Sequence, residues 1–276
     1  GKWNALDFEM IGEIAKGGEE NITPDIVVIG YSYPDKPYGI FGVEKGLKPF
    51  ENVKAVALEF TKPKNMTHEL ETLGQILGKE EQASDYINWY NEKSSSVEQA
   101  VKGLGMPKVY AEWSSAADLS TLGSGSGFDG VLSVARGFNI ANGLKGDYPK
   151  VGWEWVVPEN PDSIIKRQTQ SSDQTQIGWD SEPSSDTAKL QSVRNELLAR
   201  SGAGGISAVK SDRVYVMDWD VLNGLDQIVG VTYLANLLHP EVDLDPVAVH
   251  REYLDRLGLE YPEDRTFIYP ELSSED

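Results

Sequence analysis

The stretch EEQASDYINWYNEKSSSVEQAVKGL, residues 80–104, decides the fold. Apolar or small side chains recur in it at alternating spacings of four and three residues, the repeat of one helix face. These positions are Ala83, Ile87, Tyr90, Ser94, Val97, Val101 and Leu104. The stretch has no proline, and its first glycine is Gly103, where a helix is expected to end. The spacing therefore predicts one helix of roughly 37 Å, either a spine joining two lobes or a long surface helix within one domain.

The composition is that of an ordinary globular protein. Of the 276 residues, 39% are hydrophobic and 25% are charged, so the chain can form one large domain or two smaller ones. It contains no apolar run of about 18 residues, the length that a membrane-spanning helix needs. The chain begins with Gly1 rather than Met, so we expect a processed or shortened chain whose natural start lies upstream.

The charge and the missing cysteines exclude several classes of function. The formal net charge is −19, and the basic residues are scattered. Such a field repels phosphate backbones, so we expect no nucleic-acid partner. With no Cys, the chain has no disulfide, no thiolate metal site and no Cys nucleophile.

The segments before the long helix predict a small α/β unit. The apolar run IVVIG at residues 26–30 is typical of a buried parallel strand. The predicted order is a helix at 6–14, strands at 26–30 and 53–60, and helices around 44–51 and at 66–77. Two strands make a poor sheet, so this first lobe is expected to be incomplete.

The segments after the long helix predict a larger α/β unit. Its predicted strands are at 107–113, 162–168 (a weak one) and 213–219. Its predicted helices begin near Val131 and cover 186–199, with Asp186 as N-cap, 225–238 and 246–257. Residues 170–185 are predicted as a long loop and 260–276 as an irregular tail. Strands alternating with helices predict a parallel sheet covered on both faces.

Six segments in the correct order carry a resemblance to a known family. They are TPDIVVIG (23–30), LGQILGKEEQASDYINWY (73–90), VARGFNIA (134–141), NPDSII (160–165), AVKSDRVYVMD (208–218) and YLANLLHPE (233–241). With these segments the chain resembles the substrate-binding proteins of ABC importers for iron–siderophore, haem and corrinoid chelates. Members normally begin with a further strand–helix–strand portion, which is missing before residue 6.

The resemblance implies both a fold and a role. It implies two Rossmann-like α/β lobes, with residues 1–79 as a truncated first lobe, 80–104 as the backbone helix and 105–276 as the second lobe. It implies capture of a metal chelate outside the cytoplasm, at the cell surface or in the periplasm, by a monomer that passes it to an ABC permease. An iron–siderophore is the first choice and a corrinoid the second. No catalysis, cofactor or directly ligated metal is expected.

The resemblance also implies candidate residues. Loops at the carboxyl ends of strands contact the ligand in such folds, and aromatic rings suit bulky chelates. The expected ligand-binding residues are Tyr31, Tyr33, Trp113, Trp153 and Trp219. One acidic residue on each lobe is expected to dock to permease arginines: Glu44 on the first lobe, and Glu182 or Glu196 on the second. Packing and solvated-surface roles remain the alternatives for each.

Two further patterns have weaker interpretations. The sequence SGSGFDG contains G-x-G-x-x-G at Gly125, Gly127 and Gly130. A dinucleotide fingerprint needs its first glycine at the end of a strand, whereas eleven residues lie between the end of the predicted strand at Trp113 and Gly125. We expect a loop that approaches a ligand or caps a helix. The three histidines, at positions 68, 239 and 250, lack a partner at ligand spacing and are expected to be structural.

Two other classes of function remain open from the sequence. A ligand-binding sensor domain of the same plan cannot be separated from a transport receptor by these residues. A chelatase-like enzyme of related two-lobe plan would need a His or Glu pair converging in the cleft, and no such pair is evident.

Overall fold

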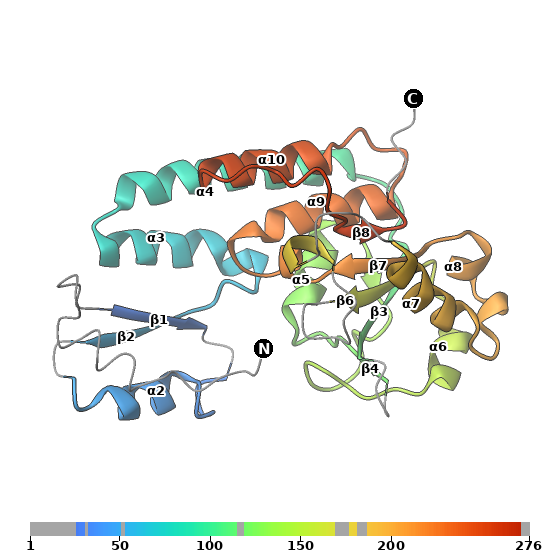
Figure 1. The fold of residues 1–276 in the computed structure, drawn as a ribbon, viewed down its shortest axis with the longest axis horizontal. Coiled ribbons are helices and arrows are strands. Elements are labelled where there is room, and N and C mark those ends of the chain that lie inside the picture. Colours follow the sequence, from blue (N-terminus) through green and yellow to red (C-terminus); the bar gives the residue numbers. More distant parts are fainter. Residues whose placement is uncertain are drawn as a thin grey trace.

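The computed structural model describes residues 26–30, 33–50, 53–114, 119–168, 177–180 and 187–271. Figure 1 shows two sheets on opposite sides of the molecule, with helices running between them. Within the described ranges, no helix is long and apolar enough to cross a membrane. The predicted helix at 6–14, the predicted N-cap Asp186 and most of the predicted loop at 170–185 lie outside the described residues.

The smaller sheet consists of two parallel strands. Strand β1 (Ile26–Gly30) pairs with β2 (Lys54–Leu58), and helix α2 (Ile40–Leu47) packs its buried Val43 and Leu47 against one face. The prediction of a helix around 44–51 was wrong in its bounds. The helix begins after Gly39 and ends at Leu47, with Lys48 as its C-cap. Pro49 follows directly, and it has no backbone N–H to donate to a further helical turn.

Two antiparallel helices follow. Helix α3 (Met66–Leu77) has the predicted bounds and ends at Gly78, whose φ of 61° is left-handed. Helix α4 (Glu80–Ala100) carries Ile87, Tyr90 and Val97 on its buried face, as predicted. It ends four residues before the predicted Leu104, because the chain turns toward the next strand over residues 101–103.

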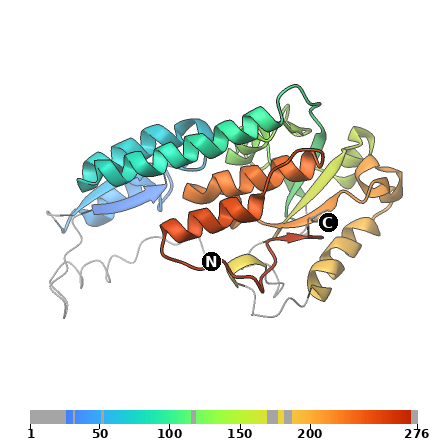
Figure 2. The same ribbon diagram turned by 90° about the horizontal axis from the view of Figure 1, so that it is seen from above.

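Helix α4 is unbroken and lies along both parts of the structure. Figures 1 and 2 show it running from above β1 and β2 to the larger sheet. It packs against α3, against α9 (Gln227–Leu238) and against α10 (Pro246–Arg256). The α10 contact includes the Trp89 ring, which stacks on Tyr253 at 6.3 Å between ring centroids.

The larger sheet has six strands in the order β4-β3-β6-β7-β8, with β5 also pairing β3. The strands are β3 (Lys108–Ser114), β4 (Ser120–Thr121), β5 (Phe138–Asn139), β6 (Ser163–Gln168), β7 (Val214–Asp218) and β8 (Ile268–Tyr269). The predicted parallel arrangement holds for β3, β5, β6 and β7. It was wrong for β4 and β8, which are antiparallel.

Strand β8 also corrects the prediction of an irregular tail at 260–276. This strand has only two residues, too few to show a period-two pattern in the sequence. It is defined by its antiparallel pairing with β7. Strand β6, which was predicted as a weak strand, lies between β3 and β7, and most of its residues are buried. A strand buried on both faces loses the polar alternation that makes a strand easy to predict.

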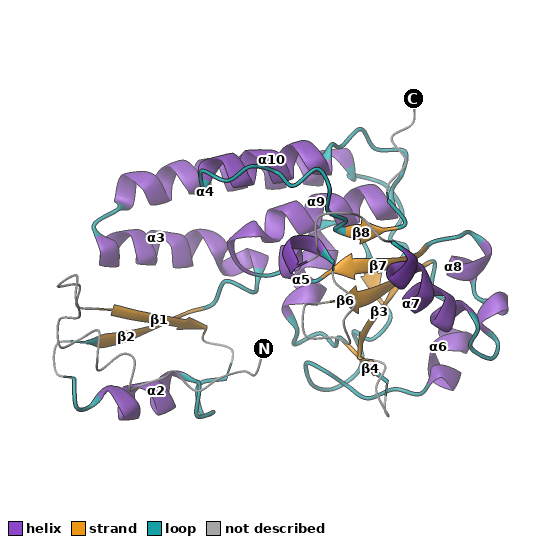
Figure 3. Ribbon diagram, in the orientation of Figure 1, coloured by secondary structure: helices purple, strands orange, loops and turns teal. Residues whose placement is uncertain are grey.

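Helices cover both faces of the larger sheet (Figure 3). Val109, Ile165 and Met217 face α4, α9 and α5 (Gly127–Val134). Tyr110 and Ile164, one residue along, face the opposite layer, formed by α6 (Trp153–Glu159), α7 (Ala188–Leu198) and α8 (Ser207–Lys210). Two helix predictions need correction. Helix α5 begins at Gly127 rather than near Val131, and its glycines lie close to residues 61–63. Helix α6 was not predicted from the sequence.

Candidate functional site

Three parallel strands of the larger sheet deliver large side chains to one edge. Trp113 lies near the end of β3, Arg167 near the end of β6, and Trp219 directly follows β7. The carboxyl ends of parallel strands share an edge, where open α/β sheets bind their ligands. The strand register therefore brings together residues that lie far apart in the sequence.

Four aromatic residues, which we call the aromatic cluster, pack at this edge: Trp113, Phe128, Tyr148 and Trp219. The ring centroids of Trp113 and Trp219 are 5.8 Å apart with an angle of 85°, an edge-to-face arrangement. Tyr148 lies 4.7 Å from Trp113, and Phe128 lies 5.1 Å from Trp219. Trp219 is buried, whereas Tyr148 is 41% exposed, so the cluster extends from the core to the surface.

A cation lies on this cluster. The guanidinium carbon of Arg167 is 3.6 Å from the centroid of the Trp113 ring, a cation–π contact. Burial lowers the pKa of Arg167, while Asp220 and Tyr148 act in the opposite direction. A guanidinium stays charged in proteins, so Arg167 gives the site a fixed positive charge beside an aromatic face.

The loop after β1 reaches the same edge. Tyr33, in that loop, donates its hydroxyl to Asp147 Oδ2 at 3.0 Å. Burial, the neighbouring Tyr148 and the hydrogen bond to Asp147 raise the pKa of Tyr33. Residues from the carboxyl ends of both sheets thus meet at one place, although 114 positions separate them in the chain.

The glycines of the G-x-G-x-x-G stretch pack closely against neighbouring segments beside this site. A Cβ at Gly125 would lie 2.0 Å from Asp147 Oδ1, and one at Gly127 would lie 2.3 Å from the carbonyl oxygen of Thr61. A Cβ at Gly130 would lie 3.1 Å from Pro63 Cδ. These glycines let α5 approach residues 61–63, which lead from β2 toward α3, and they leave room for the Asp147 side chain. The expectation that this loop approaches a ligand stays a prediction.

Of the five expected ligand-binding residues, the structure brings three together. Tyr33, Trp113 and Trp219 lie at the shared edge, and Tyr31 lies outside the described residues. Sequence reasoning missed Phe128, Tyr148, Asp147 and Arg167. Arg167 could have been found from its place near a strand end, whereas residues 147–148 follow no pattern that identifies a site.

Trp153 lies elsewhere, in the layer behind the sheet. Its indole Nε1–H donates to the carbonyl oxygen of Ser201 at 2.9 Å, and Arg200 lies 4.9 Å above its ring. The ring packs with Tyr110 rather than with the aromatic cluster. Trp153 begins α6, whose packing turns it toward this second layer, so the structure does not support its expected place in the same cleft.

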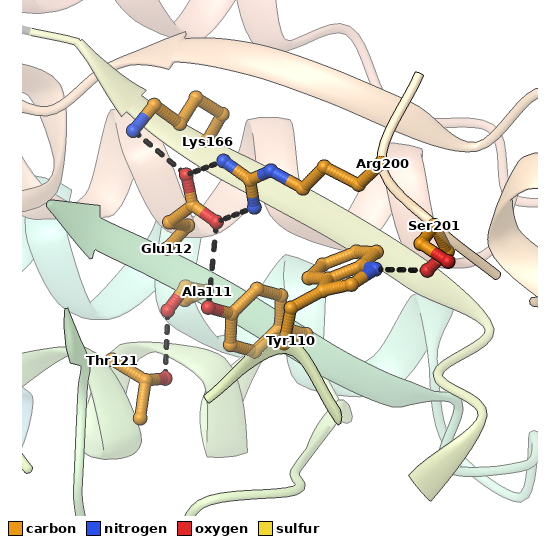
Figure 4. A network of polar contacts seen from close by, with 8 residues as sticks. Tyr110, Ala111, Glu112, Thr121, Lys166, Arg200 and Ser201 are labelled. Carbon is orange, nitrogen blue, oxygen red and sulfur yellow. Dashed lines mark hydrogen bonds and ion pairs between the residues drawn. The ribbon is translucent and has the colours of Figure 1, made fainter. Parts of the chain in front are cut away.

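Arg200 belongs to a buried charge network, shown in Figure 4. Glu112 on β3 is fully buried and accepts hydrogen bonds from Lys166 Nζ on β6 and Arg200 Nη2, each at 2.9 Å. Burial alone would raise the pKa of Glu112, but Arg200 and Lys166 hold it below its usual value. The Tyr110 hydroxyl approaches the same carboxylate at 3.4 Å. This network holds β3, β6 and the chain after α7 together.

The expected docking residues lie on the surface where they are described. Glu44 is exposed on α2, and Glu196 is exposed on α7. Glu182 lies outside the described residues. The structure leaves their docking role as a prediction.

The histidines form no metal site in the described part of the chain. His68 is exposed, and His239 and His250 are buried. Within those residues, no group of three or more His, Cys, Asp or Glu side chains is placed to hold a metal ion.

Comparisons with known proteins agree with this geometry. The sequence profile of a family described as "Periplasmic binding protein" matches residues 21–221. No curated protein matches the chain. Among solved structures, the chain is similar to the TroA-like periplasmic binding protein FepB of Veillonella parvula, with 20% identity over 93% of this chain and 79% of the other, at a TM-score of 0.69.

Two further solved structures share the fold. One is an ABC transporter substrate-binding protein of Listeria monocytogenes, with 18% identity over 85% of this chain and 81% of the other, at a TM-score of 0.65. The second is a possible iron-binding, periplasmic solute-binding protein of Staphylococcus epidermidis, with 22% identity over 85% and 80% of the two chains, at a TM-score of 0.63. The profile match covers most of the sequence, and the chain therefore belongs to the periplasmic binding protein family, whose members bind solutes for transport and are not enzymes.

Proposed function

We propose that this protein, as the solute-binding component of an ABC importer, carries a metal chelate at the aromatic cluster. An iron–siderophore complex is the first choice and a corrinoid the second. The observation that carries the proposal is the meeting of Tyr33, from the loop after β1, with Asp147 and Tyr148 beside Trp113. A ligand at this place would contact loops from both sheets.

The chemistry of the site suits a bulky organic chelate. Trp113 and Tyr148 offer stacking surface at little cost in side-chain entropy. Arg167 adds donors that can face the oxygen atoms of a chelate. The described residues contain no cluster of metal ligands, so the metal would be held by its chelator. The similar protein of Staphylococcus epidermidis is described as possibly iron-binding, which favours iron.

We divide the chain as the sequence resemblance implies. Residues 1–79 form a first lobe and residues 105–276 a second, with 80–104 as the connection. Because α4 is continuous over 21 residues, bending it would break backbone hydrogen bonds. We therefore expect small lobe movements on binding rather than a wide closure.

The partners follow from the same role. A solute-binding protein of this type works outside the cytoplasm and delivers to a permease. We propose that a monomer docks through Glu44 on α2 and through Glu196 or Glu182 of the second lobe, each facing permease arginines. Charge reversal at Glu44 should reduce transport without changing solute affinity in the isolated protein.

Titration of tryptophan fluorescence tests the ligand class. Ferric siderophores and cobalamin are added separately to the protein, and we expect quenching by one class and not the other. Trp113→Phe should lose most of the signal, because its ring lies at the edge of the site. Trp153→Phe is the matched control, since that ring packs elsewhere, and it should retain the response. Quenching that depends on Trp153 instead of Trp113 would contradict the proposed site.

A further inference from the structure

The aromatic cluster is bordered by charges of both signs. Arg167 lies against Trp113, and Asp220 is close enough to act on the pKa of Arg167. Asp147 lies at the outer side, next to the exposed Tyr148. The positive charge of Arg167 is thus opposed by the neighbouring Asp220 carboxylate, while Asp147 adds a second negative charge on the exposed side of the cluster.

Asp147 makes three contacts with its surroundings. Its carbonyl oxygen accepts a hydrogen bond from the Gly123 N–H at 2.9 Å. Its carboxylate lies against Gly125, where any side chain would collide with Oδ1, and Oδ2 accepts the Tyr33 hydroxyl. The negative charge therefore lies between the loop after β1 and the glycine-rich stretch, with the Tyr33 hydroxyl as its hydrogen-bond donor.

A solute that enters between Tyr33 and the aromatic cluster meets this carboxylate. A chelate with N–H donors or a positive charge replaces the hydrogen bond that Asp147 receives from Tyr33. A chelate with several negative charges faces a carboxylate at short range, and the net charge of −19 adds a repelling field during approach. A carboxylate at this position would separate chelates by their charge, which aromatic stacking alone does not do.

We propose that Asp147 is a specificity-determining residue that makes this protein prefer neutral or cationic ferric chelates with N–H donors, such as hydroxamates, over polyanionic tris-catecholates. The inference rests on the proposed function, since it assumes that the aromatic cluster is the chelate site. Tyr33 and Gly125 position Asp147, the first by its hydrogen bond and the second by leaving space for the carboxylate.

The test compares three ferric chelates by isothermal titration calorimetry: cationic ferrioxamine B, neutral ferrichrome and trianionic ferric enterobactin. Wild-type protein should bind ferrioxamine B or ferrichrome more tightly than ferric enterobactin. Asp147→Asn keeps the side-chain size and removes the charge. It should shift the ratio of dissociation constants for the cationic and trianionic chelates by about tenfold toward the anion.

Two control variants separate charge from structure. Tyr33→Phe removes the hydrogen bond without changing charge, so it should alter all three affinities in the same direction and leave their order intact. Asp147→Glu keeps the charge and should restore the wild-type order. Equal changes for all three chelates in Asp147→Asn would overturn this inference alone. Wild-type protein that binds none of them would overturn both the inference and the proposed function.

Discussion

The two sheets of this protein differ in how much they bury. Around β1 and β2, the described hydrophobic cluster has three buried members, Val43, Leu47 and Val53, and Val28 on β1 is 46% exposed. Around the larger sheet, one continuous cluster joins α4, α9 and the central strands. The two strands and one helix that the structure describes before residue 61 bury too little for independent stability by themselves. We therefore expect the smaller sheet to depend on its contacts with the rest of the chain.

The larger sheet also contains charges that the smaller one could not accommodate. Glu112 is fully buried between two cations, and such a carboxylate is tolerated only where its partners are fixed by surrounding structure. We therefore expect the two regions to respond differently to the same kind of substitution.

The largest effect is expected from Glu112→Gln. The variant leaves Lys166 and Arg200 without the carboxylate that both bind. Loss of one partner in a buried ion network costs about 3 kcal/mol or more, measured as the free energy of unfolding in urea. Glu98→Gln on the exposed side of α4 is the control and should be neutral. Equal stability of the two variants would contradict a tightly held charge network in the larger sheet.

Acid should also destabilise the larger region through His250. The ring is 1% exposed, and burial lowers its pKa from 6.5 to about 4. The unfolded chain then binds a proton between these values while the folded chain does not, so stability falls as the pH is lowered from 6.5 to 4. The loss reaches about 3 kcal/mol. His250→Phe, which packs among Tyr261 and Phe267 without titrating, should reduce this pH dependence.

Two matched substitutions, each of which creates a cavity in one of the regions, separate the stability of the smaller region from that of the larger one. Val43 and Val109 are both fully buried, one in each region. Val43→Ala should cost about 2 kcal/mol and should speed hydrogen exchange in α2, β1 and β2 only. Val109→Ala should speed exchange through β3 and β6 as well. Exchange that rises across the whole molecule in Val43→Ala would show that the regions unfold together.

The smallest effect is expected between α4 and α10. Glu252 accepts from Lys93 Nζ at 2.7 Å and from Trp89 Nε1 at 2.9 Å, but the Glu252 side chain is 46% exposed. Glu252→Gln should therefore cost only about 0.5 kcal/mol in a thermal or urea unfolding experiment. Glu92→Gln, at a more exposed carboxylate, should be silent. A loss as large as that of Glu112→Gln would show that α10 is fixed mainly by charge.

Hydrophobic periodicity predicted the helices of this protein better than the short strands of its larger sheet. The spacing of Ile87, Tyr90 and Val97 correctly marked the buried face of α4, because packing against one side imposes a repeat on the sequence. Strands β4, β5 and β8 have two residues each, too few for any pattern. Helix α5 begins earlier than predicted, because the small polar residues before Val131 look like a loop in the sequence. Gly127 and Gly130 are poor helix formers, yet both lie in α5, where they allow a close approach to residues 61–63.

Only the site residues that lie at or near the ends of predicted strands could be predicted from the sequence. Tyr33, Trp113 and Trp219 follow apolar runs, so their meeting at one edge could be expected from the family resemblance and the parallel order. Asp147 and Tyr148 belong to an irregular segment after β5, and nothing local indicates that it folds back toward Trp113. Trp153 looked equivalent to the other tryptophans in sequence, but α6 directs it to the opposite face of the sheet.

The edge-to-face contact of Trp113 with Trp219 also has an optical consequence. Two indoles held this close couple their electronic transitions, and such coupling gives a pair of bands of opposite sign in the circular dichroism spectrum when the two transition dipoles are skewed. The size of that signal depends on the relative orientation of the two rings. Without any attached label, rotation of either ring by an arriving solute would become visible as a change in that pair of bands.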